Sequence, residues 1–174
     1  MLTVSVNLEE LASVQGALRA TTGQIDRAAT RSLNKTLSWA GGQGRRILAQ
    51  ESGLPLKSLR SRVRIGKASR DTLRGSVWFG LAPVKAIYAG SARQTRTGVS
   101  ARGLSYTGAF LATMPSTGHL GIFKRRGPAR LPIDEQRIYL AYTAEHLSSL
   151  GARAHERLRT IFGQEINYEL RVRG

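Results

Sequence analysis

The stretch TGQIDRAATRSLNKTLSWAGGQGRRILAQE, residues 22–51, decides the fold, because it is the strongest helical pattern in the first half of the sequence. Its apolar and small residues recur every three or four positions, the spacing of one helix face. These residues are Ile25, Ala29, Leu33, Leu37, Gly41, Gly44 and Leu48. Gly53 and Pro55 follow and are typical of a helix end. We therefore predict one long helix over about residues 22–51.

The glycines within this stretch favour close packing over nucleotide binding. The segment Gly41-Gly-Gln-Gly44 is not followed by the Lys-Ser/Thr pair of a phosphate-binding loop. Each glycine costs a helix about 1 kcal/mol relative to alanine. We expect another backbone to approach the helix closely at Gly41 and Gly44.

A second long helix is predicted near the end of the chain, over about residues 143–171. Its apolar positions follow the helical spacing for several turns, and acids and bases intermix on the other positions. The apolar positions are Leu147, Leu150, Ala154, Leu158, Ile161, Phe162, Ile166 and Leu170. At the other end of the sequence, residues 2–8 alternate like a short strand, and Asn7 is placed to cap a short helix through Leu18.

Between the two long helices, the sequence is strongly basic. Residues 60–130 hold fourteen Lys and Arg against one acid, Asp71, which is a net charge of +13 out of +16 for the chain. A basic segment between nearly balanced flanks indicates a polyanionic partner, most plausibly nucleic acid. A solvated basic surface, or ion pairs between subunits, is the alternative explanation.

The same middle region, about residues 60–133, reads as β structure. We expect Arg60, Arg62 and Arg64 on one face of an extended segment, and Trp78 on the face opposite Val77 and its neighbours. The other expected elements are a strand over residues 82–88, a mobile loop over 91–105, a hairpin of strands 106–114 and 118–123, a basic turn over 124–130 and a return to the core at 131–133.

The predicted fold class is therefore α+β: a mainly antiparallel sheet packed by a long helix from the N-terminal half and a long C-terminal helix. At 174 residues, one domain over residues 1–174 is expected. The sequence has no cysteine, no apolar run of membrane-spanning length and no signal-peptide pattern. We expect a soluble protein that is made and used without secretion, and the lack of cysteine agrees with assembly in a reducing cytoplasm.

Few residues point to catalysis. The best enzyme constellation joins Asp71 with Asp134, Glu135 and His119, as a metal-dependent nuclease would require, but turn and cap positions explain these residues more simply. We predict no enzyme activity, no metal site and no cofactor. The two tryptophans, Trp39 and Trp78, are expected to pack in the core and not to stack on bases, because aromatic residues are scarce in this chain.

The candidate interaction residues are therefore basic or small. Those expected to face nucleic acid lie in the predicted loop and in the basic turn: Arg93, Arg96, Arg102, Lys124, Arg125, Arg126 and Arg130. Those expected at a contact with a neighbouring subunit are Arg60, Arg62, Arg64, Gly41 and Gly44.

Several short motifs, in order, resemble the minor tail protein Z family of long-tailed bacteriophages and prophages. The resemblance runs from about residue 25 to residue 171, without the first strand and helix and without the loop 91–105. The motifs are Ala28–Lys35, Leu56–Arg64, Thr107–Phe110, His119–Arg126, Leu131–Asp134 and Glu165–Arg171. Each is short, so their order and spacing carry the resemblance.

The resemblance implies a non-enzymatic tail-completion protein of the virion. It implies copies of the chain in a ring at the head-proximal end of the tail, near the channel through which the genome passes. The implied neighbours are the tail terminator or tail tube protein, with the head connector as a further candidate. A conduit of this kind suits non-specific contact with DNA, because phosphate contacts carry no sequence information. The alternatives are a sequence-nonspecific nucleic-acid-binding protein that acts alone, and the nuclease described above.

Overall fold

The computed structural model describes residues 2–5, 21–142 and 144–172. The chain divides into two compact units, which are treated in turn. The first unit combines Met1–Arg45, Arg62–Gly80 and Tyr142–Gly174, and the second combines Arg46–Ser61 and Leu81–Ala141. The single domain expected over residues 1–174 stays a prediction, and the predicted helix before Leu18 lies outside the described residues.

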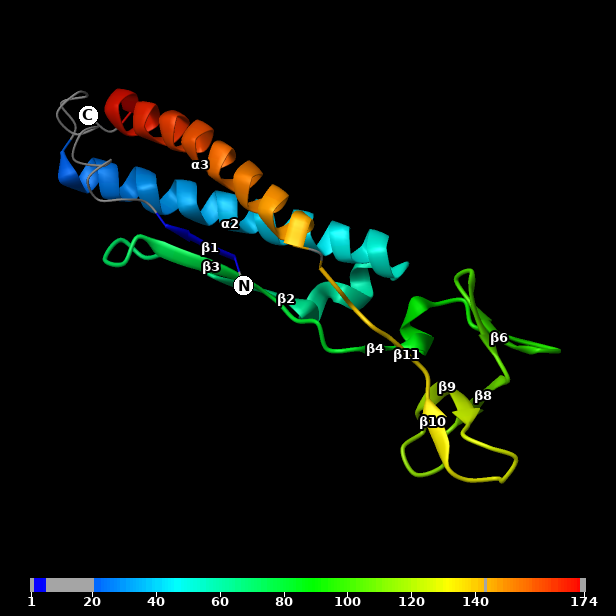
Figure 1. Cartoon of the computed structure of the whole chain (residues 1–174). Helices are drawn as coiled ribbons and strands as arrows, with labels where there is room; N and C mark the ends of the chain where they lie inside the picture. The colour runs from blue at the N-terminus through cyan, green and yellow to red at the C-terminus, as the bar shows by residue number, and fades with distance from the viewer. Residues whose placement is uncertain (1, 6–20, 143, 173–174) are drawn as a thin grey trace. The chain divides into compact units, whose positions relative to one another are not determined.

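Both long helices predicted from the sequence are confirmed (Figure 1): α2 spans Thr22–Ser52 and α3 spans Ala144–Val172. Helix α2 begins with a capping box. The Thr21 hydroxyl accepts a hydrogen bond from the backbone N–H of Gln24, and the side-chain oxygen of Gln24 accepts one from the backbone N–H of Thr21. Among the described residues, no helix has the length and apolar composition needed to cross a membrane.

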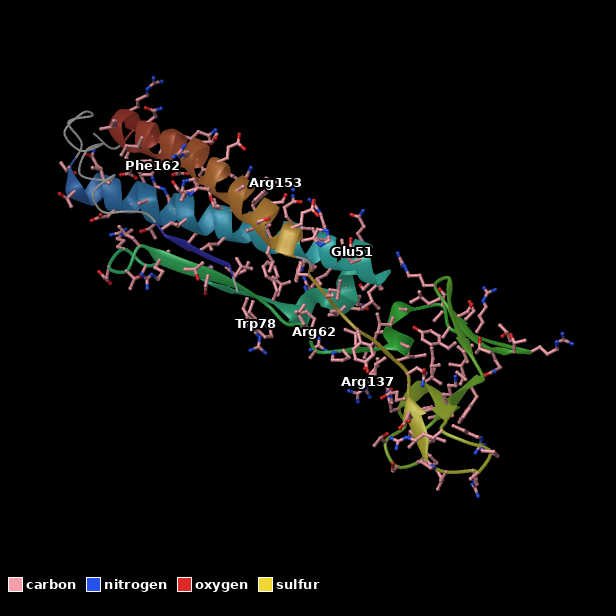
Figure 2. The ribbon with its side chains drawn as sticks, in the orientation of Figure 1. Glu51, Arg62, Trp78, Arg137, Arg153 and Phe162 are labelled. Atoms are coloured by element: carbon pink, nitrogen blue, oxygen red, sulfur yellow. The ribbon has the colours of Figure 1, made fainter. Side chains whose placement is uncertain are left out.

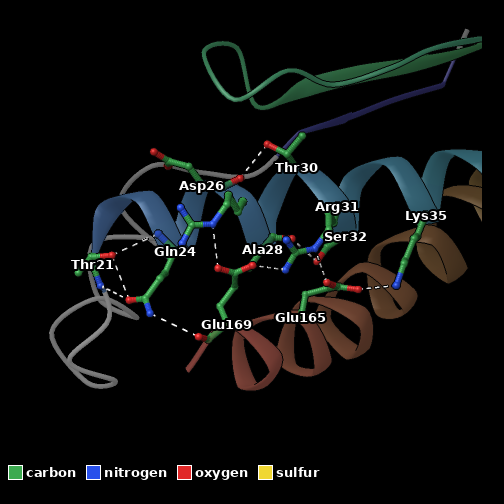
Figure 3. A network of polar contacts seen from close by, with 11 residues as sticks. Thr21, Gln24, Asp26, Ala28, Thr30, Arg31, Ser32, Lys35, Glu165 and Glu169 are labelled. Carbon is green, nitrogen blue, oxygen red and sulfur yellow. Dashed lines mark hydrogen bonds and ion pairs between the residues drawn. The ribbon is translucent and has the colours of Figure 1, made fainter. Parts of the chain in front are cut away.

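The first unit also contains a three-stranded antiparallel sheet in the order β1-β3-β2. Strand β1 spans Leu2–Ser5, β2 spans Val63–Gly66 and β3 spans Arg74–Phe79. The sheet and α3 lie along different sides of α2 (Figures 1 and 3), and α3 also contacts the edge strand β1. The α+β fold class is confirmed.

Helix α2 approaches the sheet closely at its glycines, as expected. A Cβ atom on Gly44 would lie 2.3 Å from Cε1 of Phe79, and one on Gly41 would lie 3.0 Å from Cδ1 of Ile65. The Tyr142 hydroxyl donates to the Gly44 carbonyl at 2.7 Å, and its ring centroid is 5.0 Å from that of Phe79. The small-residue face of α2 is therefore covered within the protomer.

The opposite side of α2 is joined to α3 by ion pairs with two buried carboxylates (Figure 3). Glu169, whose side chain is 0% exposed, accepts from Arg27 Nε at 2.8 Å and pairs with Arg31 Nη2 at 2.6 Å. Glu165 accepts from Arg31 Nε at 2.6 Å and also pairs with Lys35. Burial alone raises the pKa of both carboxyls, but the hydrogen bonds and charges of the α2 cations outweigh it and hold each pKa below its usual value.

The second unit contains small antiparallel sheets. Strands β5, β6 and β7 form one sheet, β8, β9 and β10 form another, and β4 pairs with β11. Their bounds are Val84–Lys85 (β4), Arg93–Thr95 (β5), Gly98–Ala101 (β6), Leu104–Thr107 (β7), Ala109–Thr113 (β8), Leu120–Arg125 (β9), Ile133–Glu135 (β10) and Arg137–Ile138 (β11). Two 3₁₀ helices, Leu56–Arg62 and Ala86–Ala89, complete the described elements.

The prediction of a mobile loop over residues 91–105 was wrong. This segment contains β5, β6 and the start of β7, and its Val99 and Ala101 side chains are buried. The Gln94 side chain fastens it to the neighbouring sheet. Its Nε2 donates to the Gly98 carbonyl at 2.9 Å, and its Oε1 accepts from the Leu111 amide at 2.9 Å. The hydrogen bonds of one polar side chain thus help to hold these short strands, which the pattern of apolar residues did not indicate.

Three further expectations need correction. Residues 82–88 form a strand only at Val84–Lys85, because the chain then turns into a 3₁₀ helix that Gly90 ends with a φ of +87°. The predicted hairpin is confirmed for β8 and β9. Residues 106–107, however, belong to β7, and Gly108, with a φ of +72°, separates β7 from β8. Leu131 does not return to the core, since it is 66% exposed.

The contacts of α2 predict opposite effects for two alanine substitutions in one turn. Gly44→Ala should destabilise the protein by about 1–3 kcal/mol, because the added methyl group overlaps the Phe79 ring. Gly42→Ala is the matched control and should stabilise it by about 1 kcal/mol, because no atom lies within 4 Å of the added Cβ and alanine favours the helix. Denaturant unfolding of both variants checks this, and equal stabilities would contradict the packing described.

The ion pairs between α2 and α3 predict a loss of stability in acid. Because the pKa values of Glu165 and Glu169 are lowered by folding, their contribution is present above the unfolded pKa of about 4.3 and disappears as the pH falls through the folded values. The double variant Glu165→Gln/Glu169→Gln should therefore show a flatter fall in unfolding free energy between about pH 6 and pH 2. Glu156→Gln, an exposed change on the same helix, should keep the native slope. An unchanged slope in the double variant would contradict the assignment.

Candidate nucleic-acid interface

The seven basic residues expected to face nucleic acid all belong to the second unit and are all exposed. They do not form one continuous run. Three come from the sheet of β5, β6 and β7, and four come from the end of β9 and the turn that follows it. The two groups differ in what holds their charges.

The first group is separated along strand β6. Thr95 pairs with Gly98, so Arg96 lies in the two-residue turn before β6. Arg102 lies in the two-residue turn after it, with Gly103, and both residues have positive φ, at 47° and 82°. The two turns are about 15 Å apart along the strand. Arg93 pairs with Ser100 and so lies toward the Arg102 end.

In the second group, two of the four cations are already engaged. Arg126 donates to both oxygens of Asp134, at 2.6 and 2.9 Å, and this hydrogen bonding lowers the pKa of the Asp134 carboxyl. The Arg125 guanidinium lies 5.5 Å from the centroid of the Phe110 ring and donates to the Arg130 carbonyl. Lys124 and the Arg130 side chain have no acidic partner among the described residues.

The carboxylates of the predicted nuclease constellation are also engaged. Glu135 accepts from His119 Nε2 at 2.6 Å and pairs with Lys85 Nζ at 3.1 Å. Burial raises the pKa of Glu135, but the hydrogen bonds from His119 and Lys85, with the Lys85 charge, leave that pKa below its usual value. Glu135 is therefore ionised and neutralised, which does not suit a general acid.

Within the second unit, only two members of the predicted constellation come together, His119 and Glu135. Asp134 points to Arg126, and Asp71 belongs to the first unit. Within residues 2–5, 21–142 and 144–172, no group of three or more His, Asp or Glu side chains is placed to hold a metal ion. No sequence pattern pointed to Lys85, which pairs with Glu135 beside His119.

The expected subunit-contact residues divide as well. Arg60 and Arg62 lie in the 3₁₀ helix Leu56–Arg62, so the prediction that they share an extended face with Arg64 was wrong. Leu56 and Leu59 are three residues apart, which is a helical and not an alternating spacing, and Leu59 is buried. Only Arg64 lies in strand β2, where it is exposed. Gly41 and Gly44 are covered by the protomer's own sheet.

The prediction of core packing for the two tryptophans is confirmed for Trp39, which packs against the core, but not for Trp78. Trp78 is 43% exposed and lies on the side of the sheet away from the helices (Figure 2), so the prediction of core packing was wrong for it. The alternation of β3 was the correct signal, because it placed Trp78 opposite Val77 and Phe79. Trp39 is half-buried, with the guanidinium groups of Arg153 and Arg157 each 5.3 Å from its ring.

Comparison with known proteins gives the family. A family model described as prophage minor tail protein Z (GPZ) matches residues 13–173, so the chain belongs to this family. No curated protein and no solved structure gives a significant match. The chain is thus a minor tail protein of prophage type, a structural component of the virion tail that works in contact with other virion components.

The unequal engagement of the basic side chains predicts unequal effects on DNA binding. Lys124→Gln and Arg130→Gln should each lower the slope of log K against log salt by about 0.9, the value for one lost phosphate contact. The double variant Arg126→Gln/Asp134→Asn removes an internal ion pair at constant net charge and should leave the slope unchanged. Fluorescence anisotropy of a labelled duplex between about 50 and 200 mM salt measures these slopes. Equal slopes for all variants, or no binding at the lowest salt, would contradict a role of this surface in DNA contact.

Proposed function

We propose that this chain is a non-enzymatic tail-completion protein that forms a homo-oligomeric ring around the DNA channel at the head-proximal end of the tail. Its membership of the minor tail protein Z family is the observation that carries the proposal. A ring suits a tail because head-to-tail contacts between identical copies close into a cycle. The partners are further copies of the chain, the tail terminator or tail tube protein and, as an additional candidate, the head connector.

The free cations of the second unit support a position beside the genome. Arg93, Arg96 and Arg102 lie at exposed edges and turns, and no ion pair holds them among the described residues. Lys124 and Arg130 are free in the same sense. A lumen that lets DNA slide requires such charges without base-reading contacts. Arg60, Arg62 and Arg64 stay candidates for contacts with a neighbouring subunit.

Particles that lack the protein test this function. Electron microscopy of lysates from a phage with the gene deleted should show tails with a defective head-proximal end, or tails that join heads unproductively. Supplying the gene from a plasmid should restore normal particles, which controls for effects on neighbouring genes. Normal infectious particles in the absence of the protein would refute the proposal. Normal tails with a defect confined to infection would refute the position at the head-proximal end.

A further inference from the structure

Among residues 2–5, 21–142 and 144–172, no helix covers the outer face of the sheet in the first unit. Strand β3 turns Val77 and Phe79 into the core, where both are buried. The alternate residues Arg74 and Trp78 are exposed on the other face. Figure 2 shows Trp78 on this outer side of the sheet.

The exposed indole ring is held in place by its own chain. Trp78 lies opposite Arg64 in the register of β2 and β3, and the Arg64 guanidinium is 5.3 Å from the ring centroid. The ring also lies over Gly80, where an added Cβ atom would be 2.4 Å from Cη2. A ring positioned in this way loses little side-chain entropy when a partner covers it.

The surroundings of Trp78 are basic. From residue 62 to residue 80 the sequence has five Lys or Arg against one acid, Asp71. Four of these cations are exposed: Arg64, Lys67, Arg70 and Arg74. Tryptophan and arginine are the residues most enriched at the energetic centres of protein interfaces. Because charges across an interface are complementary, this positive charge favours a partner surface that is acidic.

The described residues of a second copy do not supply such a surface. The exposed acids of the described chain do not form a cluster: Glu51 lies at the end of α2, Asp71 precedes β3, and Glu145 and Glu156 are eleven residues apart in α3. The exposed face of α3 is itself basic, with Arg153, Arg157 and Arg159 beside Glu156. Contact between this sheet face and another copy would therefore bring like charges together.

Nucleic acid fits this face less well than protein does. Single-stranded binding platforms use several exposed rings, and here Arg64 already covers one ring that stands alone on its sheet face. A duplex would offer phosphates to the arginines but no apolar surface to the exposed part of the indole. An acidic protein surface with an apolar contact satisfies both groups.

We propose that the outer face of β2 and β3, centred on Trp78 and Arg64, docks an acidic surface of a different protein in the tail. This inference rests on the proposed function only for the location of that neighbour in the tail. For Arg64, the inference replaces the expected contact with a second copy by a contact with a different protein.

Binding to tails assembled without this protein tests the inference. Purified native protein should co-sediment with such tails, and Trp78→Ala and Arg64→Glu should each weaken binding by at least about thirtyfold, the size of a hot-spot loss. Tyr139→Ala and Arg159→Glu are the matched controls, because they remove an exposed ring and reverse an exposed charge elsewhere. They should bind like the native protein. Polyglutamate should compete with the tails, whereas duplex DNA at equal charge concentration should not.

A second measurement follows the ring directly. In a Trp39→Phe variant Trp78 is the sole tryptophan, and its emission should move to shorter wavelength when the tails cover it. If the native protein binds the tails but Trp78→Ala and Arg64→Glu bind equally well, the docking surface is refuted and the proposed function stands. If duplex DNA competes as well as polyglutamate, the face binds nucleic acid and the inference is refuted. If the native protein does not bind the tails at all, both the inference and the proposed function fail.

Discussion

The two buried carboxylates of α3 fix how the long helices lie against each other. Glu165 and Glu169 are one turn apart, and Arg27, Arg31 and Lys35 follow one another on α2 at the same spacing, so the antiparallel helices meet as a ladder of charges. Sliding one helix by a turn of about 5.4 Å would leave a buried charge without its partner. The apolar core sets the faces that meet, and these ion pairs set the register.

Ion pairs within each unit engage several of the described acids with lysines and arginines. Glu165 and Glu169 neutralise cations of α2 within the first unit. In the second unit Asp134 and Glu135 neutralise Arg126 and Lys85. Few acids are left to oppose the remaining lysines and arginines. In the flanks of the sequence, acids and bases are therefore similar in number, and several of them are also paired with one another.

Elements with many apolar positions were predictable, and those ordered by single polar contacts were not. Leu33, Leu37 and Leu48 repeat at helical spacing, and this identified α2 nearly to its last residue. The segment around Gln94 has no such repeat, because its strands are short and a side-chain amide holds them to β8. The family, too, was predictable from the order of short motifs, although no single motif indicated it.

Which cations are free is the part of the site that no sequence pattern contains. Arg126 and Arg130 are four residues apart in one basic turn, yet only Arg126 has a carboxylate partner. That difference depends on the register of β9 and β10, which pairs Lys124 with Asp134 and brings the carboxylate within reach of Arg126. One basic segment therefore contains two kinds of cation: some pair with a carboxylate of a neighbouring strand, and others have no acidic partner among the described residues. The sequence shows only the total number of cations in the segment. The strand pairing is needed to tell the paired cations from the unpaired ones.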